Sequence, residues 1–108
     1  MPQLKEHPEL SDIQRYVAEL EDERGFADQD VLQKCLLLGE EIGELSKAVR
    51  KQLHMSIDPT AQVSSVAAEL ADILSMLCSV ANRAGVDILQ AFLVKEEINK
   101  TRTWSRQS

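Results

Sequence analysis

The segment between Asp58 and Arg83 contains only two charged side chains, Glu69 and Asp72. Its other residues are apolar or small along most of its length, and a helix that is apolar nearly all round is buried. Burying two carboxylates without partners costs several kcal/mol. This segment must therefore form a central helix, and its carboxylates need either a cation or an ion pair with arginine or lysine from another helix.

A second acidic group occurs in the stretch GEEIGELSKAVRK, which begins at Gly39. With about 3.6 residues per turn, Glu40, Glu41 and Glu44 crowd one side of a helix. Like charges at this spacing repel by a few tenths of a kcal/mol, and each interior glycine costs about 1 kcal/mol. Considered alone, the stretch is best explained as a solvated acidic face balanced by the cations that follow it, Lys47, Arg50 and Lys51.

Composition indicates one all-α domain over residues 1–108. Aromatic residues make up 4 % of the 108-residue chain, and runs of β-branched residues are scarce, which is untypical of sheets. A net charge of −6 opposes binding to a nucleic-acid polymer, because such binding depends on neutralising phosphates with lysine and arginine. A chain this short gains stability from self-association, so we expect a homodimer or homotetramer.

Capping signals predict four helices in a four-helix-bundle-like protomer, over residues 12–24, 30–52, 60–84 and 87–103. Three starts pair a capping residue with glutamine three positions later, and a fourth combines a capping residue with proline. Glycines suited to helix ends follow the first and third helices. These signals are Ser11 with Gln14, Asp30 with Gln33, Asp87 with Gln90, Asp58 with Pro59, and the terminators Gly25 and Gly85.

The second helix has an apolar stripe that predicts its core-facing side. The stripe follows a three-four rhythm and consists of Cys35, Leu38, Ile42, Leu45 and Val49. Glu41 and Glu44 belong to a line one position earlier, so we expect them to border the core. The two cysteines stand singly in apolar surroundings, and we expect both to be buried reduced thiols.

The two acidic pairs together predict a metal site. If the second and third helices pack antiparallel, ExxE on one and ExxD on the other bring four carboxylates together. Carboxylates suit hard cations, so Mg²⁺ is the expected metal and Mn²⁺ the alternative. His7 and His54 stand outside this pattern, and we expect them to be exposed loop residues.

Mg²⁺ is commonly bound through a few carboxylates together with substrate phosphates, so a phosphorylated substrate is the natural partner. Lys95, Asn99 and Arg102 recur on one face of the last helix, and Trp104 follows. The cations could hold phosphate, Asn99 could contact a base or sugar, and Trp104 could stack. Lys34 could reach phosphate or balance charge. Each of these residues taken singly is also an ordinary surface or packing residue.

These motifs resemble the MazG-like nucleotide pyrophosphohydrolases of the all-α NTP pyrophosphatase superfamily. The family motif, EExxE followed by ExxD, occurs here in GEEIGEL and ELADIL, and the segments ERGF, ANRAGVDI and KEEINKTR also match in type. The resemblance extends from Leu10 to Trp104 and implies that Mg²⁺ is bound by four carboxylates. These are Glu41, Glu44, Glu69 and Asp72.

The resemblance also implies an activity, the hydrolysis of nucleoside triphosphates, often deoxynucleotides, to monophosphate and pyrophosphate. Glu40 and Glu41 would be the catalytic residues, with Glu40 orienting or deprotonating water or holding a further metal. Lys95 and Asn99 match the family's substrate contacts, whereas Arg102 and Trp104 match less closely. Two alternatives stay open: a hydrolase of the same fold that acts on another pyrophosphate-linked substrate such as phosphoribosyl-ATP, and a non-catalytic helical module.

No segment of the sequence predicts a membrane span. The amino-terminal segment MPQLKEHPEL has no apolar run typical of a signal peptide, and the apolar segment from Val63 to Ala81 carries Glu69 and Asp72 near its middle. We therefore expect a cytoplasmic protein.

Overall fold

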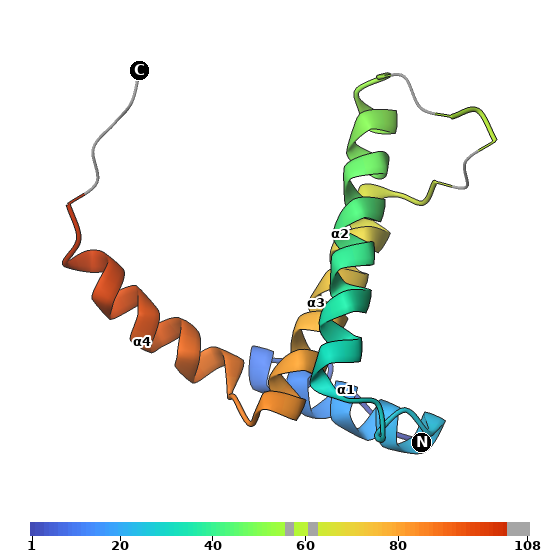
Figure 1. The fold of residues 1–108 in the computed structure, drawn as a ribbon. Helices are drawn as coiled ribbons and strands as arrows, with labels where there is room; N and C mark the ends of the chain where they lie inside the picture. The colour runs from blue at the N-terminus through green and yellow to red at the C-terminus, as the bar shows by residue number, and fades with distance from the viewer. Residues whose placement is uncertain (56–57, 61–62, 104–108) are drawn as a thin grey trace.

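The structure, a computed structural model, describes residues 1–55, 58–60 and 63–103. These residues form four helices and no strand, namely α1 (Leu10–Arg24), α2 (Val31–Gln52), α3 (Val66–Ala84) and α4 (Ile88–Lys100) (Figure 1). The predicted all-α class is confirmed.

Local capping explains why two of the predicted helix starts are right. Asp30 accepts a hydrogen bond from the Gln33 backbone N–H at 2.8 Å, and Gln33 returns one to the Asp30 N–H, so α2 begins where its capping box predicts. Asp87 caps α4 in the same way through the Gln90 N–H at 3.1 Å. The left-handed residues Gly25 (φ 77°) and Gly85 (φ 69°) end α1 and α3, as expected.

The other two predicted starts are wrong. Helix α1 begins two residues early, because Glu9 and not Ser11 is its cap, in a reciprocal box with Asp12. Helix α3 begins at Val66 and not near residue 60, with Ser65 accepting from the Ala68 N–H at 3.1 Å. Asp58 instead accepts from both the N–H and the hydroxyl of Thr60, and such a local turn competes with helix formation.

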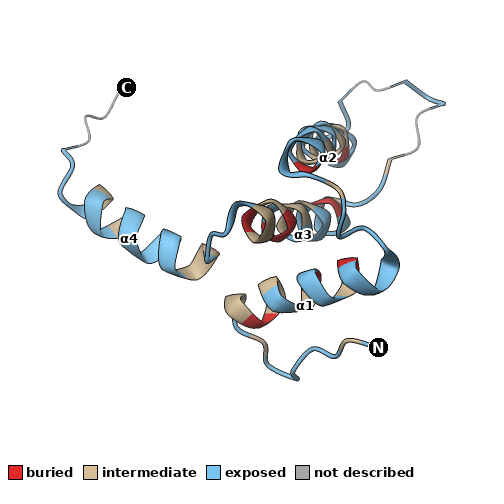
Figure 2. Cartoon of the chain, turned by 60° about the horizontal axis from the view of Figure 1, so that its bottom comes forward, coloured by how far each residue is buried: buried red, intermediate tan, exposed pale blue. Residues whose placement is uncertain are grey.

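Helix α3 is the centre of the protomer. It packs along α2 and, on another side, against α1, and the buried residues of these three helices face one another (Figures 1 and 2). Helix α4 has no buried residue and projects away from the other three after a 93° bend. The packed part of the protomer is therefore built from three of the four helices.

Gln14 fixes the junction where α4 departs. Its amide donates to the Val86 carbonyl at 2.7 Å and accepts from the Ile88 N–H at 3.0 Å. It also exchanges hydrogen bonds with Asn82 of α3, at 3.0 and 3.1 Å. The start of α4 is thereby tied to α1, while the rest of α4 stays exposed.

No single helix in the described part of the chain has the length and apolar character of a membrane span. Helices α3 and α4 meet those criteria only as a pair, across the 93° bend that separates them.

A buried ionic network holds α1, α2 and α3 together. The Glu21 carboxylate of α1 accepts from Arg83 of α3 at 3.0 Å, from the Ser79 hydroxyl at 2.9 Å, and pairs with Lys34 of α2 at 3.2 Å. Arg83 also donates to the backbone carbonyls of Phe26 and Gln29, so the connection between α1 and α2 belongs to the same network. Burial alone would raise the pKa of Glu21, but these donors outweigh it and lower the pKa below the usual value of 4.5.

The phase of the α2 core stripe was predicted one position wrong. The line that packs inside the protomer contains buried Lys34 and Ala48 together with half-buried Glu41. The predicted stripe points outward, with Ile42 and Val49 exposed. Cys35 is likewise exposed, contrary to expectation, whereas Cys78 is buried as expected, and its burial raises the pKa of the thiol.

Candidate metal centre

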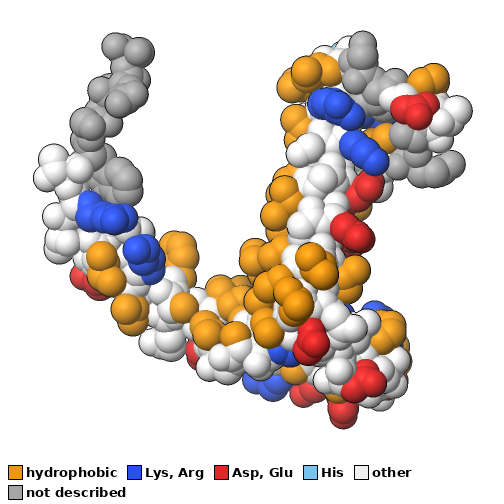
Figure 3. Space-filling model, viewed as in Figure 1, with side chains coloured by type: hydrophobic (Ala, Val, Ile, Leu, Met, Phe, Trp, Pro, Cys, Tyr) orange, Lys and Arg blue, Asp and Glu red, His pale blue; other side chains and the backbone are white. Residues whose placement is uncertain are grey.

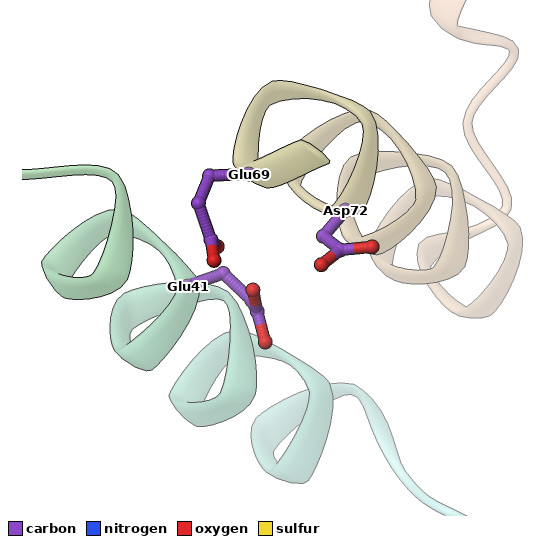
Figure 4. Close-up of side chains that lie close together, drawn as sticks. All are labelled: Glu41, Glu69 and Asp72. Atoms are coloured by element: carbon purple, nitrogen blue, oxygen red, sulfur yellow. The ribbon is translucent and has the colours of Figure 1, made fainter. Parts of the chain in front are cut away.

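Three carboxylates meet between α2 and α3. Glu41 projects from α2, while Glu69 and Asp72 project from one side of the first two turns of α3 (Figure 4). One oxygen of each lies within 4.8 Å of the others. The antiparallel packing of the two helices and the three-residue spacing on α3 produce this carboxylate triad, so most of the predicted acidic cluster is confirmed as a spatial group.

The triad lacks a positive partner within the described residues. Glu69 is 6 % exposed, and its Oε1 accepts from the Ser64 hydroxyl, but its buried Oε2 has no hydrogen-bond donor. Burial, the neighbouring Glu69 carboxyl and the charge of Asp72 raise the pKa of Glu41 above its usual value. The protein has thus concentrated negative charge at a point where its own groups leave it uncompensated.

The side chains of the triad fit a hard divalent cation. All the ligand atoms are carboxylate oxygens, and the buried unpartnered oxygen of Glu69 is a ligand position that costs free energy when left unfilled. The alternative of an ion pair from another helix is not what the structure shows. The candidate cation Lys34 pairs with Glu21, and Lys47 lies 3.5 Å from Glu44 on its own helix.

Two of the predicted acidic site residues lie outside the triad. Glu44 is half-buried one turn beyond Glu41, where it pairs with Lys47, and its role as a fourth ligand stays a prediction. Glu40 is exposed beside Glu41 on α2, and its catalytic role stays a prediction.

The predicted substrate-binding residues are spread over the molecule. Lys34 is 4 % exposed and engaged with Glu21, which is the charge-balancing alternative left open by the sequence. Lys95 and Asn99 lie on α4, away from the triad (Figure 1). Arg102 is exposed just after α4, and Trp104 falls outside the described residues. The Oδ1 atom of Asn99 is buried and lacks a hydrogen-bond partner in the described part of the chain.

The glycines that opened the question of this helix are not explained by packing within the protomer. A Cβ atom added at Gly39 or Gly43 would meet no atom within 4 Å. The reason for both residues must therefore lie in what approaches α2 from outside the protomer.

Sequence reasoning missed the cavities on either side of the triad. Phe26 and Met76 line one of them, and Lys51 and His54 line the other. His54 was expected to be an exposed loop residue and is exposed, but it adopts a left-handed backbone conformation (φ 57°). No spacing pattern in the sequence marks these residues, because each cavity joins segments that are far apart along the chain.

Comparison with known proteins identifies relatives of this site. The family model described as the MazG nucleotide pyrophosphohydrolase domain matches residues 29–103. Two crystal structures of iMazG from Vibrio DAT 722 are 35 % and 34 % identical, with TM-scores of 0.66 and 0.67; they match 86 % and 91 % of this chain and 99 % of their own. No curated protein sequence gives a significant match.

A third solved structure carries ligands in its printed description. It is the cyanophage S-2L MazG-like pyrophosphohydrolase bound to dGDP and three catalytic Mn²⁺ ions per active site. It is 25 % identical, with a TM-score of 0.70, and the match covers 96 % of this chain and 90 % of that one. Since the family model spans most of the chain, including the whole carboxylate triad, the chain belongs to the MazG nucleotide pyrophosphohydrolase family.

Proposed function

We propose that the protein is a Mg²⁺-dependent enzyme that hydrolyses nucleoside triphosphates to the monophosphate and pyrophosphate. Deoxynucleotides are the expected substrates, and removal of unwanted nucleotides from the cytoplasmic pool is the expected purpose. The observation that carries this proposal is the carboxylate triad, with the unpartnered oxygen of Glu69 at its centre. The Mn²⁺ and dGDP bound by the cyanophage relative support a metal and a deoxynucleotide.

The residues of the chain divide the work as follows. Glu41, Glu69 and Asp72 hold the cation, and Glu44 completes the set if Lys47 releases it. When bound, the metal neutralises the triphosphate and lowers the pKa of water at the site. Glu40 accepts the proton of the water that attacks the α-phosphorus, and the bond from that phosphorus to the bridging oxygen of pyrophosphate breaks. Positioning supplies most of the catalysis, and no covalent nucleophile is needed.

A substrate panel tests the proposal. The purified full-length chain is incubated with Mg²⁺ or Mn²⁺ and separate canonical and modified nucleoside triphosphates, and with phosphoribosyl-ATP. Chromatography follows monophosphate and pyrophosphate. We expect metal-dependent release of pyrophosphate from at least one deoxynucleotide. Release from phosphoribosyl-ATP alone would replace the substrate class, and no release from any compound would leave the non-catalytic alternative.

We further propose that two copies of the chain associate through the outward faces of α2 and α4. Leu32 and Leu36 of α2 are each 64 % exposed, and Phe92 and Val94 of α4 are each 62 % exposed. These hydrophobic side chains gather on surfaces that border the open space between α4 and the rest of the protomer (Figure 3). Exposed patches of this extent are untypical of a monomer.

A second copy would account for two features that the protomer leaves unexplained. It would cover the outward stripe of α2, where the side of Gly39 and Gly43 is open to close approach. It would also bring Lys95 and Asn99 of one copy toward the phosphates held at the triad of the other. We expect light scattering to give at least twice the chain mass of 12.1 kDa. Phe92→Glu should reduce that mass, while Glu23→Gln on exposed α1 should not, and a monomeric wild-type chain would refute the proposal.

A further inference from the structure

A groove between α2 and α3 carries one cavity on each side of the carboxylate triad. The first, which we term the aromatic cavity, has a volume of about 180 Å³ and is lined by residues that include Val17, Leu20, Phe26, Lys34, Ser75 and Met76. The second, termed the cationic cavity, has a volume of about 360 Å³, and its lining includes Ala48, Lys51, His54, Ser64 and Ser65.

Both cavities lie within reach of one nucleotide bound at the triad. Lys34 precedes Glu41 by seven residues on α2, and Met76 follows Asp72 by four on α3. At 1.5 Å per residue these separations are about 10 Å and about 6 Å along the helix axes. On the other side, the Ser64 hydroxyl bonds directly to Glu69 and also lines the cationic cavity, so that cavity adjoins the triad.

The aromatic cavity has the chemistry to bind a planar heteroaromatic ring. Phe26 is 45 % exposed, so its ring is accessible for stacking, and Met76 adds a polarisable wall. Lys34 supplies charge at the base of the cavity, 5.5 Å from the Phe26 ring centroid. Its ammonium has three donors. Its ion pair in the described chain is with Glu21, so it can also donate to an acceptor on the ring edge.

The cationic cavity has the chemistry to bind phosphate groups. Lys51 contributes an ammonium, and His54 and the two serines contribute hydrogen-bond donors. The cavity also opens onto the N-terminus of α3 at Val66, where the first backbone N–H groups and the positive end of the helix dipole favour anions. Lysine and arginine side chains gather at this end of α2, beyond the acidic side chains (Figure 3).

We propose that the substrate lies along this groove in one direction, with its base in the aromatic cavity, its α-phosphate at the triad, and its β- and γ-phosphates in the cationic cavity. Pyrophosphate then leaves past Lys51 and the N-terminus of α3. This inference rests on the proposed function, because it assigns the two ends of a nucleoside triphosphate to named parts of the same site.

The two reaction products test the two cavities separately, without turnover. Isothermal titration calorimetry with Mg²⁺ measures the binding of inorganic pyrophosphate and, separately, of the monophosphate of the best substrate. Phe26→Ala should weaken the monophosphate about tenfold, in the range that base–aromatic stacking contributes, and leave pyrophosphate unchanged. Phe26→Tyr keeps the ring and should bind the monophosphate like the wild type. Leu4→Ala is the control, because Leu4 is 43 % exposed and lies outside the cavity.

Lys51→Glu should show the opposite pattern, with pyrophosphate binding weakened about tenfold, which corresponds to about 1.4 kcal/mol, and monophosphate binding unchanged. Arg50→Glu is its matched control, because it makes the same charge change on the same helix turn outside the cavity lining. Equal effects of Lys51→Glu and Arg50→Glu, or losses exchanged between the two products, would overturn the proposed direction. If the substrate panel itself releases no pyrophosphate, the proposed function fails, and the products then bind no differently in any variant.

Discussion

Glu69→Gln is expected to remove metal-dependent pyrophosphate release, by at least about 100-fold. The scale follows from metal sites in general, where loss of a residue that merely supports a ligand costs about 10- to 100-fold. The substitution keeps the size of the side chain and removes only the charge at the buried, unpartnered oxygen. Initial rates of pyrophosphate release over a range of Mg²⁺ concentrations measure the loss.

The same variant separates metal binding from folding. The glutamine amide can donate to Glu41, so without metal the variant should be at least as stable as the wild type. A hundredfold excess of metal over its Kd stabilises a native site by about 2.7 kcal/mol, and Glu69→Gln should lose most of that gain. Thermal melts with and without Mg²⁺ measure both effects, with Glu23→Gln as the control. Full stabilisation by Mg²⁺ in Glu69→Gln would contradict the assignment of the triad as the metal centre.

The second large effect is expected at a residue outside the metal centre. Glu21→Gln should lower the free energy of unfolding by about 3–5 kcal/mol, because it leaves Arg83 and Lys34 as buried cations without their carboxylate. Urea unfolding at one fixed protein concentration measures this difference, since self-association would make the stability depend on concentration. Exposed Glu23 on the same helix gives the matched variant, Glu23→Gln, which should lie within about 0.5 kcal/mol of the wild type.

The effect of Glu21→Gln should also depend on pH. The pKa of Glu21 is lowered in the folded state, so its contribution to stability is present above the unfolded-state value of 4.5 and is lost as the pH falls through the folded-state pKa. The unfolding curves of the wild type and the variant should therefore converge in acid, below about pH 4.5. The double variant Glu21→Gln with Lys34→Met, which removes one of the uncompensated cations, should recover part of the loss. A constant difference across this pH range would contradict the role of the Glu21 charge.

The parts of the fold that the sequence predicts are those governed by local chemistry. Helix α2 begins at its capping box, and α1 and α3 end at glycines, because each of these features depends on a few neighbouring residues. The start of α3 was misplaced for the same kind of reason. Asp58 has the side chain of a helix cap, but its oxygen serves a turn with Thr60, and both uses look alike in a sequence.

The site divides in a similar way. The ExxD spacing on α3 and one glutamate of EExxE were sufficient to predict the triad, because antiparallel packing of two helices brings them together. The network around Glu21 could not be predicted, since its partner Arg83 is far away in sequence and no local pattern links the two. The α2 stripe misled for a different reason. Apolar periodicity shows that a face is covered, but it does not show whether the protomer or a second copy covers it.

The central position of α3 has a consequence for the order in which the protein can form during synthesis. Helices α1 and α2 emerge from the ribosome first, yet both pack principally against α3, and the charges of Glu21 and Lys34 await Arg83 near its end. Isolated helices of this length are marginally stable in water. The nascent chain therefore holds two amphipathic helices without their shared partner until residue 84 has left the ribosomal tunnel, and this interval is when it depends most on chaperones.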